Sequence, residues 1–197
     1  MSEIPSIIPV DIPDGEKGNW KVYTFSVSKE DETAQMFRSL FGGRGRYVPA
    51  GTYKGLSLRG QIIMSNTPDE IRDHRAFFKE ARGRVLINGL GLGIALNVVL
   101  HKLDVNGKPA VTEAIVVEKS PDVIDLVQGS FKDKRIKFVL YDALEYKAEG
   151  TFDAVWHDIW PIINVSNLKE MQKLHRKYGR KTNWQGSWCR RECERHL

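Results

Sequence analysis

The acidic residues of this sequence that are best placed to do chemistry are Glu118, Asp142 and Asp158, each of which ends or follows a short apolar segment. A carboxylate at the end of a strand can accept hydrogen bonds from a ribose diol, which is the role expected of Glu118. Asp142 can accept a hydrogen bond from an adenine amino group, while the backbone N–H of Ala143 serves a ring nitrogen. Taken singly, each acid is equally typical of a turn, a helix cap or a surface ion pair. It is therefore the order of the three acids along the chain that predicts a nucleoside site.

A glycine-rich turn precedes these acids. Gly89, Gly91 and Gly93 alternate with leucines directly after an apolar segment and directly before a helical pattern. Glycine is needed where the chain turns sharply or approaches a ligand closely, and the following helix N-terminus offers N–H groups to an anion. The dinucleotide pattern requires a sixth-position glycine, where this chain has Ile94, so NAD and FAD are disfavoured. The alternative is that the glycines have only a structural role, in a tight strand–helix turn with no ligand.

Four apolar segments, at 85–88, 113–118, 136–140 and 152–156, alternate with helical patterns at 92–103 and 121–128. This alternation predicts an α/β fold with a parallel, doubly wound, Rossmann-like sheet covered by helices on both faces. Ligands of such sheets bind beyond the carboxyl ends of the strands. The glycine turn and the three acids are therefore expected to meet there.

The region before this core has a different pattern. An irregular lead-in is expected over residues 1–19, a strand over 20–27, and a β-hairpin over 52–65 with its turn at Arg59 and Gly60. The hairpin and a basic loop at 42–46 are expected to shape a substrate pocket.

Two helices are predicted in this region from their start signals. Ser28 with Asp31 forms a capping box for a helix reaching Phe41, where Gly42 and Gly43 end it. Thr67, Pro68 and Glu70 give a second capped start, for a helix reaching about Ala81.

The order of these features resembles the class I S-adenosylmethionine-dependent methyltransferases, and most closely their spermidine-synthase-like branch. The stretches that carry the resemblance are VLINGLGLG (85–93), IVVEKSPDVI (115–124), VLYDALEY (139–146), FDAVWHDIWP (152–161) and the gate-helix-like DEIRDH (69–74). The likeness spans roughly residues 52–161. Short chains of this kind occur among bacteriophage proteins, so the resemblance also suggests a viral origin and the host cytoplasm.

The resemblance implies S-adenosylmethionine as cofactor, with the glycines around its methionine part, Glu118 on the ribose, Asp142 and Ala143 on the adenine, and His74 near the methionine tail. The residues expected to hold it are Asn88, Gly89, Gly91, Gly93, Glu118, Lys119, Asp142, Ala143 and His74. Asp158 is expected to face the methyl acceptor, as the group that orients or deprotonates it. Trp160 would stack on a flat acceptor, or simply pack. His157 is less suited, because strand alternation points it away.

Departures from the family pattern bear on the reaction. Leu92 stands where spermidine synthases have an aspartate, Asp73 stands where they have a tyrosine, and Ile159 to Pro161 lacks their second acid. These changes argue against aminopropyl transfer and favour methyl transfer to an unidentified small-molecule or nucleic-acid acceptor. An aminopropyltransferase, a non-catalytic binder of the cofactor or of nucleic acid, and a cofactor-degrading enzyme stay as alternatives.

Composition limits the remaining possibilities. The 197 residues include only two cysteines, Cys189 and Cys193, which excludes a disulfide framework and favours a reducing cytoplasm. No apolar run approaches the ~20 residues of a membrane span. Cys189, Cys193 and His196 share one predicted helix face, where buried thiols are favoured over a metal site. No metal is expected.

The basic charge is concentrated in a C-terminal tail. Residues 169–197 carry nine Lys or Arg and three Glu, for a net charge of +6, whereas the other 168 residues carry −1. Such a tail is typical of a solvated helix face or of a weak nucleic-acid contact, in which Trp184 and Trp188 either pack or stack on bases. A helix over 167–178 and a short helix from Gln185 are predicted.

Only 39 residues follow Asp158, so the sheet is expected to be truncated, with its edge covered by the N-terminal strand, the tail or a second subunit of a homodimer. The predicted organisation is an N-terminal extension (1–66), a cofactor-binding core (67–165) and a basic helical tail (166–197).

Overall fold

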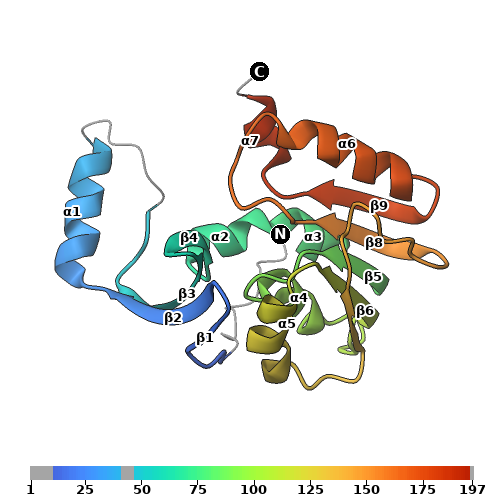
Figure 1. Ribbon diagram of the computed structural model, residues 1–197, viewed down its shortest axis with the longest axis horizontal. Helices are drawn as coiled ribbons and strands as arrows, with labels where there is room; N and C mark the ends of the chain where they lie inside the picture. The colour runs from blue at the N-terminus through green and yellow to red at the C-terminus, as the bar shows by residue number, and fades with distance from the viewer. Residues whose placement is uncertain (1–10, 41–46, 196–197) are drawn as a thin grey trace.

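The computed structural model describes residues 11–40 and 47–195, which form two sheets and the helices around them (Figure 1). The larger sheet has five strands, all parallel, in the order β7-β6-β5-β8-β9. Its strands are β5 (Gly83–Asn88), β6 (Val111–Glu118), β7 (Ile136–Leu140), β8 (Phe152–His157) and β9 (Thr182–Ser187). The predicted α/β class and parallel sheet are confirmed.

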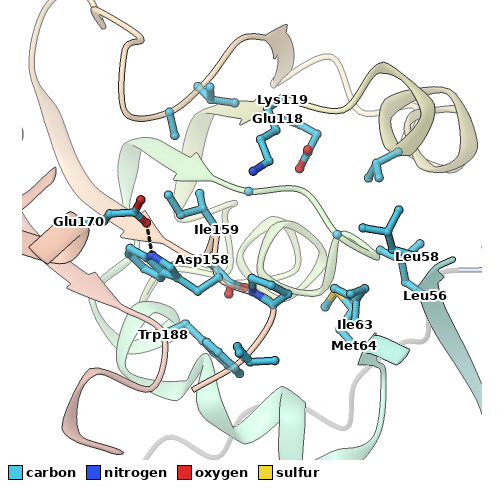
Figure 2. A pocket seen from close by; sticks show the side chains of 18 of the residues that line it. Leu56, Leu58, Ile63, Met64, Glu118, Lys119, Asp158, Ile159, Glu170 and Trp188 are labelled. Carbon is cyan, nitrogen blue, oxygen red and sulfur yellow. Dashed lines mark hydrogen bonds between the residues drawn. The ribbon is translucent and has the colours of Figure 1, made fainter. Parts of the chain in front are cut away.

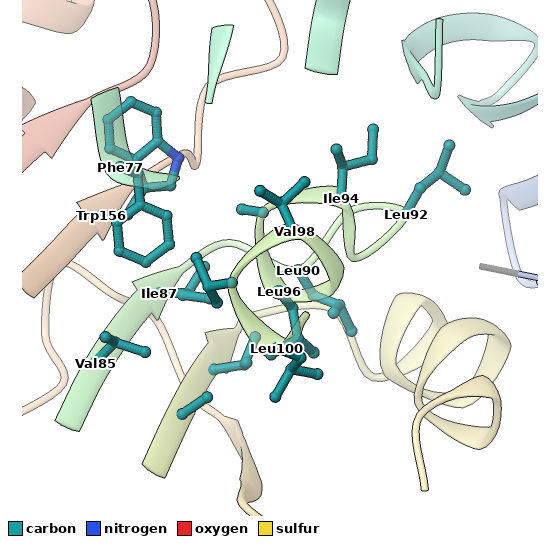
Figure 3. Packing of buried hydrophobic residues seen from close by; sticks show 14 of the residues in the cluster. Phe77, Val85, Ile87, Leu90, Leu92, Ile94, Leu96, Val98, Leu100 and Trp156 are labelled. Atoms are coloured by element: carbon teal, nitrogen blue, oxygen red, sulfur yellow. The ribbon is translucent and has the colours of Figure 1, made fainter. Parts of the chain in front are cut away.

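Helices cover both faces of this sheet, as right-handed crossovers between parallel strands require. Val85 and Ile87 of β5 face a core shared with α3 (Arg75–Glu80), α4 (Ile94–Leu100) and α5 (Pro121–Val127) (Figure 3). Leu86, between them in the sequence, faces the opposite core. There it packs with Met171 and Leu174 of α6 (Asn167–Tyr178). The near-continuous apolar sequence of β5 follows from its burial on both faces.

Helix α4 is shorter than the predicted 92–103. It begins at Ile94 because Gly93 occupies its N-cap with a left-handed φ of 69°, and it ends at Leu100. The helix after β6 agrees better with its prediction. Ser120 caps α5 by accepting a hydrogen bond from the Val123 N–H, and a short 3-10 turn (Gln128–Ser130) follows.

The smaller sheet is antiparallel, in the order β1-β2-β3-β4. Its strands are β1 (Gly15–Lys17), β2 (Trp20–Val27), β3 (Gly51–Leu58) and β4 (Gln61–Ser65). The hairpin is confirmed. Its two turn residues, Arg59 and Gly60, have positive φ values of 51° and 79°, which suit a two-residue loop between twisted strands. The lead-in is not wholly irregular as predicted, because β1 pairs with β2.

Helix α1 (Lys29–Leu40) stands apart from the rest of the molecule in Figure 1. Its predicted capping box is present, because the Ser28 hydroxyl accepts from the Asp31 N–H at 3.0 Å and the Asp31 carboxylate accepts from the Ser28 N–H at 3.2 Å. The predicted stop at Gly42 and Gly43, like the loop at 42–46, lies outside the described residues.

The predicted helix over 68–81 is instead two helices, α2 (Pro68–Asp73) and α3, which meet at His74. The Thr67 side chain makes no capping hydrogen bond, so the predicted capping box is wrong. The Glu70 carboxylate instead accepts from the N–H and the hydroxyl of Ser65, at 2.7 and 2.9 Å. Glu70 therefore connects the first turn of α2 to the end of β4.

The end of the chain corrects another prediction. The segment predicted to become helical at Gln185 is β9, the fifth parallel strand, and only α7 (Arg190–Glu194) after it is helical. Trp184 of β9 stacks on Trp156 of β8, with ring centroids 6.3 Å apart, so packing decides the conformation. The tail therefore covers one edge of β8, while the N-terminal strand β2 lies in the other sheet. Within residues 11–40 and 47–195, no sixth or seventh strand joins the parallel sheet.

Cys189 and Cys193 are buried and are not joined by a disulfide, and His196 lies outside the described residues. In the part of the chain that the structure describes, no cluster of His, Cys, Asp or Glu has the arrangement of a metal site. None of the helices in this part is long and apolar enough to cross a membrane.

Candidate active site

A cavity of about 510 Å³ lies where the strands of the parallel sheet end (Figure 2). Glu118 at the end of β6, Asp142 after β7 and Asp158 after β8 all line it, beside Gly89 and Gly91 of the turn after β5. Nine of the eleven predicted site residues line this cavity; Asn88 and Gly93 do not. The meeting of acids and glycine turn follows from the parallel topology, which brings the carboxyl ends of these strands to one edge.

Glu118 connects the glycine turn to the end of β6. One carboxylate oxygen accepts from the Leu90 N–H at 3.0 Å, and the other accepts from the Ser120 N–H at 2.8 Å. Each carboxylate oxygen has a second acceptor site, so the group can still receive hydroxyl donors from a ligand. Glu118 thus shapes the turn and presents its charge to the cavity at the same time.

The glycines of the turn are required by the packing of the protein itself. A Cβ on Gly89, where φ is +99°, would lie 1.9 Å from the Asp158 carbonyl oxygen. A Cβ on Gly91 would meet the Met64 sulfur at 2.2 Å, and one on Gly93 would meet the Phe131 ring at 2.4 Å. Gly93 therefore approaches the protein core, in contrast to its predicted contact with a cofactor.

Asn88 also differs from its prediction. Its side chain is fully buried and donates to His157 Nδ1 at 2.8 Å, so it is not available to a ligand in the cavity. The Asn88 backbone carbonyl accepts from the Asp158 N–H at 2.8 Å. Asn88 therefore positions Asp158 through the backbone.

Asp158 has a strongly shifted pKa. Its side chain is 18% exposed, and burial, together with the nearby carboxylates of Glu70, Asp73 and Glu118, raises its pKa to about 7. His74 Nε2 lies 3.8 Å from Asp158 Oδ2. A carboxyl group that titrates near neutral pH is suited to exchange a proton with a bound acceptor.

Trp160 is held mainly by the protein. Its indole N–H donates to Glu170 at 2.8 Å, drawn as the dashed line in Figure 2, and the side chain is 7% exposed. It packs in the core beneath α6 and reaches the cavity with part of its surface. The alternative of a packing role is thus favoured over stacking on an acceptor.

The two predicted adenine-binding residues also serve the local turn. Asp142 accepts from the Leu144 N–H at 2.7 Å, and the Ala143 carbonyl accepts from Lys177 at 3.1 Å. Both still line the cavity, as does Lys119.

The sequence analysis expected the hairpin to shape the pocket, but it did not identify the individual residues that form the apolar wall of the cavity. This wall consists of Trp20, Leu56, Leu58, Ile63 and Met64 from the smaller sheet and Trp188 from the chain end. The Trp188 indole N–H donates to Asp73 of α2 at 3.1 Å. Apolar alternation in the hairpin indicates one covered face but does not indicate which partner covers it.

The polar part of the cavity is strongly acidic. Its charged lining comprises the carboxylates Glu70, Glu118, Asp142, Asp158 and Glu170 and the single ammonium group of Lys119. Low-dielectric walls lined by one sign of charge concentrate ions of the opposite sign. The cavity therefore favours a cationic ligand with an apolar part.

Neither a family model nor a curated protein matches this sequence. Among solved structures, the chain is similar to the N-methyltransferase NodS from Bradyrhizobium japonicum in complex with S-adenosyl-l-homocysteine, at 14% identity over 66% of this chain and 68% of that chain, with a TM-score of 0.47. It is also similar to a precorrin 8w decarboxylase from Methanobacterium thermoautotrophicum, at 12% identity over 60% of this chain and a TM-score of 0.42. An S-adenosylmethionine-dependent methyltransferase from Clostridium acetobutylicum matches 58% of this chain at 12% identity and a TM-score of 0.41.

The chain spans 59% and 44% of the lengths of the last two proteins. A structural likeness at such identities does not assign an activity.

Proposed function

We propose that this protein is an S-adenosylmethionine-dependent methyltransferase. The observation that carries the proposal is that Glu118, Asp142 and Asp158 line one cavity beside the glycine turn, at the carboxyl ends of neighbouring parallel strands. An adenosyl sulfonium is a cation with a ribose, a flat base and an apolar linker. An acidic cavity with one apolar wall is complementary to each of these features.

Each cavity residue has a defined task in this proposal. Glu118 accepts the ribose hydroxyls, Asp142 and Ala143 hold the adenine, and Gly91 and His74 border the methionine part. S-adenosylmethionine, when bound, supplies a methyl group that is already activated as part of a sulfonium. The protein then has mainly to align a nucleophile with it and exclude water.

Asp158 is the residue proposed to act on the acceptor. Its backbone is held by Asn88, and its carboxylate accepts a proton from the amine or hydroxyl that attacks the methyl group. The pKa of about 7 keeps a large fraction of this carboxylate ionised, and therefore basic, at neutral pH. The nearby acids Glu70 and Glu118 favour the protonated carboxyl that remains after the transfer.

The test is calorimetric titration of S-adenosylmethionine and S-adenosylhomocysteine into the wild type and Glu118→Gln. We expect Glu118→Gln to weaken both ligands by about tenfold or more, because it removes a charge-assisted acceptor. Glu113→Gln is the matched control, since Glu113 lies on the same strand and pairs with Arg84 at 2.6 Å, away from the cavity. Circular dichroism checks that both variants fold. Equal affinity of the three proteins would refute the ribose role of Glu118.

Aminopropyl transfer is a second candidate, because Glu70 and Glu170 give the cavity more negative charge than one sulfonium needs and a polyamine would also suit it. Against it, Leu92 is 2% exposed in the core and supplies no acid to the site. Incubation with S-adenosylmethionine or its decarboxylated form, each with putrescine, separates the two by product mass. Cofactor loss without any acceptor would identify a cofactor-degrading enzyme instead.

A further inference from the structure

A second cavity of about 890 Å³ runs along β9 at the edge of the parallel sheet, between the α2–α3 segment and α7. We call it the basic groove. Its charged lining comprises the basic residues Arg72, Arg75, Lys79, Arg190 and Arg191 and the acidic residues Asp73 and Glu192. The charge of this groove is therefore opposite to that of the acidic cavity.

Part of this positive charge is not neutralised by the protein. Arg72 pairs with Asp69, and Arg190 pairs with Glu194 at 2.9 Å. Arg75, Lys79 and Arg191 are exposed, and none of the three forms an ion pair with any residue in the ranges 11–40 and 47–195. Three cations from two separate elements thus face one groove and are available to an anionic ligand.

The strand edge in the groove is partly blocked as a template for another strand, at Trp184. The Thr182 hydroxyl donates to the Trp184 carbonyl at 2.7 Å and accepts from the Trp184 N–H at 3.3 Å. These are groups that an added strand would need. The groove therefore offers charge more than backbone pairing, which favours a polyanion over a second copy of the chain.

The basic groove and the acidic cavity lie on opposite sides of the Trp188–Asp73 hydrogen bond. Asp73 lines the groove while its neighbour His74 lines the cavity, and Trp188 lines the cavity while its neighbour Cys189 lines the groove. In a ligand that spans this contact, the basic groove would attract the anionic part, and the acids of the cavity would repel that same part.

We propose that the basic groove binds the phosphodiester backbone of a nucleic acid whose base is the methyl acceptor at Asp158. A nucleic acid has this division of charge, because its phosphates are anionic and its bases are not. The inference names the substrate class of the proposed methyltransferase and therefore rests on that function.

The first test measures binding of a labelled 12-nucleotide single-stranded DNA by fluorescence anisotropy at several salt concentrations, with the RNA of the same sequence in parallel. We expect Arg75→Ala/Lys79→Ala to bind about tenfold or more weakly at low salt. The slope of log affinity against log salt should fall by about 1.4, because each phosphate contact on a single strand contributes about 0.7. Lys134→Ala/Lys137→Ala is the control, since these exposed lysines lie at the opposite edge of the sheet, beside and on β7. It should behave as the wild type.

The second test follows labelled methyl transfer to the same oligonucleotides and cofactor binding by calorimetry. Transfer that is lost in the groove variant while cofactor affinity is unchanged supports the inference. Cofactor binding without oligonucleotide binding, or equal oligonucleotide binding by the groove and control variants, overturns the inference and leaves the proposed methyltransferase function intact. Groove-dependent oligonucleotide binding without cofactor binding overturns the proposed function instead. A dimer that the groove variant abolishes, with no oligonucleotide bound, would show that a second copy occupies the groove and would also overturn the inference.

Discussion

His157 and Asp158 are consecutive residues, and their surroundings reverse the usual order of their pKa values. His157 is buried between the side chains of Asn88 and Gln185, and burial lowers its pKa to about 3. Asp158 faces the acidic cavity, where burial and neighbouring carboxylates raise its pKa to about 7. The carboxyl therefore keeps its proton to a higher pH than the imidazole. This order makes Asp158, and not the adjacent histidine, the group that exchanges protons near neutral pH.

The pH dependence of methyl transfer should report the pKa of Asp158. We expect kcat/KM to rise with pH up to about 7 and then to level, because only the ionised carboxylate can accept the proton of the acceptor. Asp158→Asn should lower kcat by about a hundredfold or more and abolish this rise. The measurement is the rate from pH 5.5 to 8.5 at saturating cofactor. A wild-type profile without a change near pH 7 would contradict the role of Asp158.

Folding stability should depend on pH through the same two residues, with opposite signs. The raised pKa of Asp158 contributes stability that is lost as pH rises through about 7, whereas the lowered pKa of His157 contributes stability that is lost as pH falls below 6.5. Asp158→Asn removes only the first effect. The free energy of unfolding of Asp158→Asn minus that of the wild type should therefore be about 2 kcal/mol larger at pH 8 than at pH 5.5, so that the variant gains stability relative to the wild type as pH rises. Urea unfolding at both pH values measures this, and an equal difference at the two would argue against a raised pKa.

The glycines should differ in their tolerance of alanine according to what their Cβ would meet. Gly107→Ala, at a φ of +75° with no atom within 4 Å, should cost only the strain of a left-handed residue, about 1 kcal/mol. Gly91→Ala should cost more than this, because its Cβ would meet the Met64 sulfur. The additional cost should be small, because the flexible Met64 side chain can move away. Gly89→Ala should cost more than both, about 3 kcal/mol, because the Asp158 carbonyl is backbone and cannot yield cheaply. Urea unfolding of the three variants tests this order, and Gly89→Ala as mild as Gly107→Ala would contradict it.

The contact between Trp188 and Asp73 should couple the chain end to α2. The indole N–H donates to a carboxylate at 3.1 Å, and a hydrogen bond to a charged group contributes about 1.5 to 3 kcal/mol. A double-mutant cycle of Trp188→Phe and Asp73→Asn, measured by urea unfolding, should therefore give a coupling energy of about 1 kcal/mol or more. Trp184→Phe with Asp73→Asn is the control pair, because Trp184 packs on Trp156. The effects of these two substitutions on the free energy of unfolding should be additive. A coupling near zero at Trp188 would show that this contact does not hold the chain end.

Local patterns in the sequence were sufficient for most of the core. Alternation, apolar runs and turn residues predicted four parallel strands and the hairpin, because these signals depend on burial and on backbone conformations within a few residues. The parallel arrangement then placed Glu118, Asp142 and Asp158 at one edge, since the carboxyl ends of such strands must meet. The sequence alone therefore predicted these three acids of the polar lining, but it did not identify Glu70 and Glu170, which also line the cavity.

Tertiary packing decided what these local signals left open. The segment around Gln185 became a strand because β8 offered it an edge and Trp156 offered it a stacking surface, neither of which a local pattern contains. Asn88 turned into the core because His157, 69 residues away, supplied its hydrogen-bond partner. The apolar wall of the cavity, the basic groove and the raised pKa of Asp158 arise in the same way. Each depends on which distant residues come within a few ångströms, and the sequence specifies those distances only through the complete fold.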